Sequence, residues 1–164
     1  MVKYILQFMC ILLTGGKISK LKKDSLKLED QLCFPLYVAS RKVISLYHPY
    51  LKPLNITYTQ YIVFMALWNN ERMTVSELGK MPFLDNGTLT PLLKKMEAQG
   101  YITRTRSDKD ERVMMISLTE AGWQMKEKCR DIQTSVEDSV DIDPDNSQDL
   151  YALLYSLRKK VSDK

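Results

Sequence analysis

The sequence is poor in the side chains that bind metals and form disulfides. Its 164 residues include one histidine, His48, and three cysteines, Cys10, Cys33 and Cys129, with no CxxC pair among them. A structural zinc site needs about four ligands in close pairs, so we expect neither a metal site nor a cofactor. Three thiols also cannot build a disulfide-rich secreted fold, which makes a reducing cytoplasm the expected location.

Apolar runs long enough to cross a membrane are missing as well. The longest, between Tyr4 and Leu13, has about ten residues, whereas a spanning helix needs about 20. It faintly resembles the apolar part of a signal peptide, but residues 17–20 provide no small-x-small cleavage site after it. We expect no membrane partner. Residues 1–24 form an N-terminal extension of unknown role, which either packs on the body or a partner chain or reflects a misassigned start codon.

A strong charge of either sign is absent too. Lys and Arg number 24 against 20 Asp and Glu, so the net charge is +4. This mild excess permits a nucleic-acid partner without arguing for one. With 45% hydrophobic and 27% charged residues, the chain is neither a disordered polyelectrolyte nor a membrane protein. Its length suits one ordinary domain with its own core.

Apolar residues recur at helical spacing on both sides of a short segment with strand-like alternation. This pattern predicts a mainly α protein with a small β-hairpin, an α+β fold. Capping boxes begin two of the helices, at Thr57 and Thr74. Helices are expected over about 28–50, 57–68, 74–80, a start between 86 and 90 up to Gly100, 119–136 and 147–161, and strands over 101–106 and 112–118.

Two prolines restrict where helices begin, because proline is tolerated in a first turn and kinks a helix interior. Pro35 predicts either a helix start near Asp30 and Gln31 or a bend in a longer helix. Pro91 is expected to lie in the first turn of its helix.

A short helix, a turn, a second helix and a basic hairpin are the layout of a winged helix-turn-helix. In that layout the second helix enters the major groove of DNA, and the hairpin reaches a minor groove or the phosphates. Short polar side chains near a helix start, with cations one turn on, suit such contacts better than they suit a merely solvated surface. The predicted DNA contacts are Asn86, Thr88, Thr90, Pro91, Lys94 and Lys95 in the helix and Arg104, Arg106, Asp108, Lys109 and Arg112 in the hairpin.

Two long segments carry a family resemblance. LDNGTLTPLLKKMEAQGYITRTRSDKDERVMMISLTEAG resembles the recognition helix and wing of MarR-family transcriptional regulators, with the wing motif at 108–112 and the LTEAG string at 118–122. LEDQLCFPLYVASRKVISLYHPYLKPLNITYTQYIVFMALW is similar to the N-terminal helices of the OhrR-type branch, which senses organic hydroperoxides. The similarity covers roughly residues 26–136.

The resemblance implies a winged helix-turn-helix lobe at 57–118 and dimerisation helices at 25–56 and 119–164. The apolar faces of the last two predicted helices favour a homodimer independently, since the small lobe cannot cover them. A two-fold dimer would place two recognition helices about 34 Å apart on pseudo-palindromic operator DNA. Two positions depart from the branch: Asn86 replaces its usual Ser, and Pro35 replaces a helix-friendly apolar residue.

Cys33 is the candidate sensor, because the resemblance to the OhrR-type branch centres on it. In a first turn set by Pro35, the helix dipole and free amides would stabilise a thiolate, the form that peroxide oxidises to a sulfenic acid. The branch implies that two tyrosine hydroxyls hydrogen-bond the reactive sulfur, at Tyr47 and Tyr58. Tyr47 follows Cys33 by roughly 21 Å of helix rise, so it would reach only the cysteine of a partner chain. Tyr37, one turn from Cys33, is a further candidate.

These residues predict a repressor that releases its operator when Cys33 is oxidised. The sulfenic acid would then condense with a small cellular thiol or with a second cysteine. Cys129 is the candidate resolving thiol and Cys10 a weaker one. The competing interpretation for both is ordinary burial, which is common for free cysteine.

Three other functions use the same features differently. A MarR-type regulator could bind a small aromatic or phenolic ligand at the junction of dimer helices and wing, where the same tyrosines would line the pocket. A thiol peroxidase would need a base near Cys33, but His48 lies far along the chain with no carboxylate pattern beside it, so we expect no enzyme. A degenerate winged helix would bind DNA weakly and without sequence preference.

Overall fold

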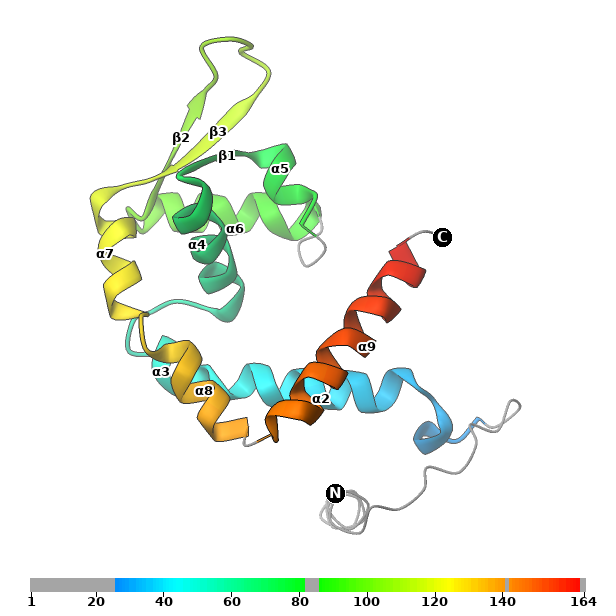
Figure 1. Cartoon of the computed structure of the whole chain (residues 1–164). Coiled ribbons are helices and arrows are strands. Elements are labelled where there is room, and N and C mark those ends of the chain that lie inside the picture. The colour runs from blue at the N-terminus through cyan, green and yellow to red at the C-terminus, as the bar shows by residue number, and fades with distance from the viewer. Residues whose placement is uncertain (1–25, 82–85, 141, 163–164) are drawn as a thin grey trace. The chain divides into compact units, whose positions relative to one another are not determined.

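The computed structural model of the chain describes residues 26–81, 86–140 and 142–162 (Figure 1). The described residues fall into two units, with the boundary in the chain between Lys42 and Val43. The predicted extension over residues 1–24, with Cys10, lies outside the described residues. Within them, no helix is both long and apolar enough to cross a membrane.

The first unit contains a 3₁₀ turn, Leu28–Asp30, and most of helix α2, Cys33–Leu46. Pro35 is the third residue of α2 and lies in its first turn, so the predicted helix start is confirmed within a few residues and no bend is needed. No residue of α2 is buried.

The second unit begins with the last residues of α2 and continues with helices α3 and α4. Helix α3, His48–Leu51, carries Pro49 in its first turn, and this proline cannot donate to a preceding carbonyl. The helix predicted to run to residue 50 therefore breaks at Tyr47. Helix α4, Tyr58–Asn70, begins at the predicted capping box, where Thr57 and Gln60 satisfy each other's backbone amides.

Helix α5, Val75–Gly79, and helix α6, Asn86–Ala98, form the helix-turn-helix. The predicted hairpin consists of strands β2, Ile102–Arg106, and β3, Met114–Leu118. A third strand, β1, Arg72–Thr74, pairs antiparallel with the far side of β3, and the sequence pattern does not predict it. It is three residues long and overlaps the N-cap of α5, so it carries no alternation of its own. Figure 1 shows β2 and β3 extending as a wing from this lobe.

The core of the lobe is centred on α4 and α6. Glycine at position 100 stops α6 as predicted, with φ of +76° and paired bonds from Gly100 N to Glu97 O and from Tyr101 N to Met96 O. Apolar side chains at 2% exposure or less come from most elements of the lobe and from the flanking helices α3 and α8: Leu51, Val63, Phe64, Leu67, Leu78, Leu89, Leu93, Met96, Ile102, Ile116 and Val136.

The single helix predicted over 119–136 is wrong, because it is two helices. Helix α7, Glu120–Lys128, ends at Cys129, and helix α8 spans Ile132–Val140. A tight turn joins them, with Ile132 N donating to Cys129 O at 3.2 Å. This turn brings both of those side chains into the core, at 3% and 5% exposure, and no glycine or proline marks it in the sequence.

The last helix, α9, spans Pro144–Ser162. It starts three residues before the predicted Ser147, because Pro144 fits a first helical position and Asp143 accepts the amide of Asp145. Every side chain of α9 that the structure describes is at least partly exposed.

Candidate DNA-binding and sensor sites

Helix α6 presents its predicted DNA contacts to solvent. Leu89, Leu93 and Met96 anchor the opposite face in the core, at 1% exposure or less. The spacing of these anchors leaves the outward face to polar residues and cations, as a recognition helix requires. The exposed members of the predicted set are Thr88, Thr90, Pro91, Lys94 and Lys95. Asn86 is the first residue of α6, and its side chain lies outside the described set.

Pro91 does not lie in the first turn of α6, so that prediction is wrong. The helix begins at Asn86, and Pro91 is inside it. Because proline has no backbone N–H, the helical hydrogen bond to the carbonyl of Gly87, four residues earlier, cannot form.

The tip of the wing is built by Asp110. Its carboxylate Oδ1 accepts the amide of Arg112 at 2.9 Å, and its carbonyl accepts the amide of Val113 at 2.9 Å. Arg106 donates from its guanidinium to the carbonyl of Glu111. These bonds hold the exposed side chains of Asp108, Lys109 and Arg112 on a shaped turn.

Arg104 differs from the other predicted wing contacts, because it points to the protein. Its Nη1 lies 3.5 Å from Glu97 Oε2 on α6, and its side chain is 20% exposed. Its Nε is buried without a partner among the described residues. This geometry fits a residue that fixes the wing against the recognition helix better than one that reaches DNA.

The predicted tyrosines Tyr47 and Tyr58 lie together in the second unit. Their ring centroids are 4.8 Å apart. Burial raises the pKa of both phenols, and for Tyr47 the nearby Tyr58 and Glu137 add to that effect. Both hydroxyls therefore stay protonated at neutral pH and are available as hydrogen-bond donors.

Cys33 and Tyr37 lie in the first unit, one turn apart on α2. Cys33 is exposed and is the first residue of the helix. Tyr37 is 58% exposed, and its hydroxyl accepts a long bond of 3.4 Å from Arg41. Cys33 thus lies in the first turn of α2, the part of a helix where backbone amides lack intrahelical acceptors.

Cys129 has the opposite environment. It is 3% exposed at the end of α7, and burial raises the pKa of its thiol to about 11. A buried, protonated thiol is a poor nucleophile, so the structure does not favour the predicted resolving role.

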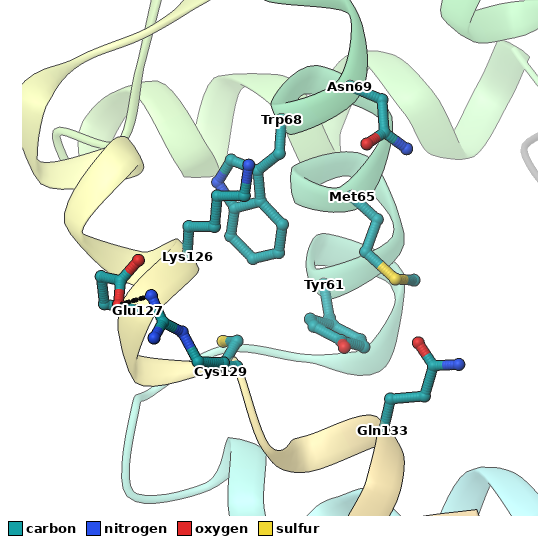
Figure 2. A pocket seen from close by; sticks show the side chains of 9 residues that line it. Tyr61, Met65, Trp68, Asn69, Lys126, Glu127, Cys129 and Gln133 are labelled. Atoms are coloured by element: carbon teal, nitrogen blue, oxygen red, sulfur yellow. Dashed lines mark ion pairs between the residues drawn. The ribbon is translucent and has the colours of Figure 1, made fainter.

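A hollow of about 360 Å³ lies between α4 and the α7–α8 segment (Figure 2). Tyr61, Met65 and Trp68 line it from α4, and Lys126, Cys129 and Gln133 line it from the other side. Burial raises the pKa of Tyr61 to about 12, so its hydroxyl is a donor here too. The sequence does not predict this hollow. Its two walls, α4 and residues 126–133, are far apart in the chain, and each has the residue pattern of an ordinary helix face.

A row of aromatic rings connects the tyrosine pair with the wing. Tyr61 lies 5.9 Å from Tyr47 and 6.2 Å from Trp68 between ring centroids. Phe64 continues the row, at 5.4 Å from Trp68 and 5.3 Å from Tyr101 at the base of β2. The indole of Trp68 also donates to the carbonyl of Gly122 at 3.1 Å.

Comparisons with known proteins place the chain among transcriptional regulators. The family model of the SarA/Rot transcriptional regulators covers residues 45–129, more than half of the chain. The organic hydroperoxide resistance transcriptional regulator of Bacillus subtilis is 46% identical over 143 residues, 87% of this chain and 97% of that protein.

Two solved structures support the same fold. The structure of reduced AbfR bound to DNA matches with a TM-score of 0.66 at 33% identity, and the match covers 82% of this chain and 94% of the AbfR chain. AbfR is a protein of Staphylococcus epidermidis. A mutant of MarR from E. coli, complexed with operator DNA, has a TM-score of 0.69 at 26% identity and covers 77% of this chain and 92% of that one.

Proposed function

This chain belongs to the MarR family of winged-helix, DNA-binding transcriptional regulators, and from that premise we propose that it is a repressor released from its operator by organic peroxide. The proposed sensor is Cys33. The observation that carries the proposal is its placement as an exposed first residue of α2, while the second described cysteine is buried. The 46% identity to an organic hydroperoxide resistance regulator supports the same class of signal.

The chemistry begins at the sulfur of Cys33. The thiolate attacks the terminal oxygen of the hydroperoxide, the O–O bond breaks, and the alkoxide leaves as the alcohol after taking a proton. The sulfur loses two electrons and becomes a sulfenic acid. A small cellular thiol then condenses with it, which forms a mixed disulfide and releases water. The buried Cys129 makes this route simpler than an internal disulfide.

The regulator is proposed to act as a homodimer. Apolar side chains on α2 and α9 are exposed, among them Val43, Ile44, Leu153 and Leu154 at 40–69%. A second copy would bury them and would bring its own Cys33 to the Tyr47–Tyr58 pair, whose protonated hydroxyls can donate to the sulfur. Condensation of the oxidised sulfur with a thiol would break these tyrosine contacts and shift the spacing of the two recognition helices on the operator.

DNA contacts are assigned to the exposed side chains of α6 and the wing. Thr88, Thr90 and Lys94 on α6 would meet the major groove, and Lys109 and Arg112 at the wing tip would meet the phosphates or minor groove. The proposed surface is completed by Asn86 at the start of α6, Pro91 inside it, Lys95, Arg106 and Asp108. Arg104 is proposed to hold the wing against α6 by its ion pair with Glu97, without contacting DNA itself.

The test is a titration of operator-bound protein with cumene hydroperoxide. Mobility shift and intact mass are read on the same samples. Release of DNA, together with a mass increase of a sulfenic acid or thiol adduct on Cys33, is the expected result. Cys33→Ser should bind the operator and stay bound, and Cys129→Ser is the matched control that is still released. Release of DNA from the Cys33→Ser protein, or retention of DNA by fully oxidised wild type, would contradict the proposal.

A second candidate function is a regulator released by a small aromatic or phenolic ligand. The hollow beside α4 favours it, because the ring of Trp68 and the cation Lys126 suit an aromatic acid, whereas Arg130 is already paired with Glu127. Tyr37, Tyr47 and Tyr58 do not line this hollow, although they were predicted to line a ligand pocket. Release of DNA by benzoate under reducing conditions, lost in Trp68→Ala, would favour this function over peroxide sensing.

A further inference from the structure

Gln60 is a fully buried polar side chain in the core of the lobe. It is 0% exposed and occupies the third position of α4. A buried side-chain amide is costly unless its oxygen and its nitrogen both find partners. Its partners therefore show which parts of the lobe this residue holds together.

The amide of Gln60 is the centre of a directed relay of hydrogen bonds. The backbone N–H of Thr57 donates to Gln60 Oε1 at 2.9 Å, and Gln60 Nε2 donates to Gln99 Oε1 at 2.6 Å. Gln99 Nε2 in turn donates to the backbone carbonyl of Asn55 at 3.2 Å. Because a backbone N–H can only donate and a carbonyl can only accept, neither amide can flip without losing a bond.

This relay joins the two sites described above. Gln99 directly follows α6, so it sits at the end of the recognition helix. Thr57 is the N-cap of α4 and directly precedes Tyr58, whose ring packs on Tyr47. Asn55 holds the intervening loop in a left-handed conformation, with φ of +54°. The end of α6 is thus bonded on both sides of the segment that carries Tyr58.

We infer that the Gln60–Gln99 amide pair positions the recognition helix relative to the tyrosine pair and couples the two. A shift of Tyr58 moves the N-cap of α4. Separation of Gln60 from Gln99 would leave a buried amide unpaired, so α6 follows the shift instead. This inference rests on the proposed function for its signal, while the positioning itself concerns only DNA binding.

The test uses Gln99→Leu, which removes both bonds of Gln99 and leaves the capping box of α4 intact. Operator affinity is measured by fluorescence anisotropy before and after cumene hydroperoxide, with the extent of Cys33 oxidation matched by intact mass. We expect the affinity of the reduced protein to fall roughly tenfold and the ratio of reduced to oxidised affinity to shrink by a similar factor. Gln124→Leu, at an exposed position of α7, should change neither value.

A rescue pair separates the relay from general packing. Gln60→Glu places two acceptors face to face, and Gln99→Lys places two donors face to face. The double variant restores a donor–acceptor pair and a donor toward Asn55, so it should recover most of the ratio. A Gln99→Leu protein with a lower melting temperature but a wild-type affinity ratio would overturn the inference, and so would a double variant no better than its parents.

Failure of peroxide sensing can be distinguished from failure of the coupling between Tyr58 and the recognition helix. Wild type that keeps its operator after oxidation disproves peroxide sensing, and the coupling is then measured without oxidant. Tyr58→Ala and Gln99→Leu are combined, and operator affinities of the four proteins are compared. Independent sites give multiplicative effects, which would overturn the coupling, whereas a deviation of about fivefold or more supports it.

Discussion

The apolar side chains of the lobe around α4 are buried, whereas those of helix α9 are exposed. Val63, Phe64 and Leu67 of α4 are 0% exposed, whereas Tyr151 and Leu153 of α9 are 63% and 69% exposed. The lobe completes a core with its own residues. The apolar side chains of α9 gain that burial only from another surface, and the same holds for α2, which has no buried residue.

The two described cysteines fall on opposite sides of this division. Cys33 lies on the open helix α2, and Cys129 lies in the core of the lobe. The same residue type is therefore exposed in one region, where we propose that it reacts, and packed in the core in the other. Four predictions test how far this contrast extends, starting with the largest expected effect.

The first prediction concerns the open face of α9. Changing Leu150 and Leu153 to aspartate should make the protein monomeric, because charges replace the apolar surface proposed to bind a second copy. Operator affinity should fall by about 10²–10⁴, since the two half-site contacts are no longer linked. Sedimentation and anisotropy measure the two effects. Gln148→Asp on the same helix is the control, and a variant that stays dimeric would refute the contrast.

The second prediction compares the two thiols directly. Each is alkylated with iodoacetamide in a variant whose other cysteines are serine. A pKa raised by burial from about 9 to about 11 leaves Cys129 roughly 100-fold less thiolate at pH 7 than an ordinary cysteine, before its restricted access to the reagent is considered. Its labelling rate should rise tenfold per pH unit up to about 11, as long as the lobe stays folded. Equal alkylation rates for Cys33 and Cys129 at pH 7 would contradict the expected difference in reactivity between the two thiols.

The third prediction concerns the packing density of the lobe. A Cβ on Gly122 would lie 2.2 Å from the carbonyl oxygen of Tyr101 and 2.9 Å from Leu118 Cδ2. Gly122→Ala should therefore destabilise the lobe by about 1–3 kcal/mol, because backbone has to move. Urea unfolding measures the loss. Gln124→Ala on the same helix should stay within about 0.5 kcal/mol, and an equally stable Gly122→Ala protein would mean that the lobe can yield there.

The smallest expected effect is on alkaline stability. Burial raises the pKa of Cys129 to about 11 from an ordinary value near 9, so the folded state holds this proton more tightly than the unfolded chain. Stability from this group is complete below pH 9 and is lost as the pH rises toward 11. Cys129→Ala should flatten the decline in unfolding free energy between pH 9 and 10.5, despite lower stability at pH 7. A decline as steep as that of wild type would show that Cys129 does not contribute to it.

Much of the lobe could be predicted from local sequence signals. The capping boxes at Thr57 and Thr74, the stop at Gly100 and the apolar spacing of Leu89 and Leu93 all correspond to observed features. Each of these signals acts within one turn of helix, so it is visible without knowledge of the fold. The break between α7 and α8 depends on packing in the core, and the strand β1 depends on pairing with β3. No local sequence signal predicts either feature.

The sequence by itself determined most of the order of helices and wing and the outward polar face of α6, and it offered the first-turn placement of Cys33 as one of two alternatives set by Pro35. These follow from periodicity, caps and prolines, which are local interactions. Only the tertiary structure decided that Cys129 is buried, that Arg104 faces Glu97 and that Gln60 bonds Gln99. Those outcomes depend on which residues distant in the chain are brought into contact, because burial and pairing are properties of the packed core and not of any one segment.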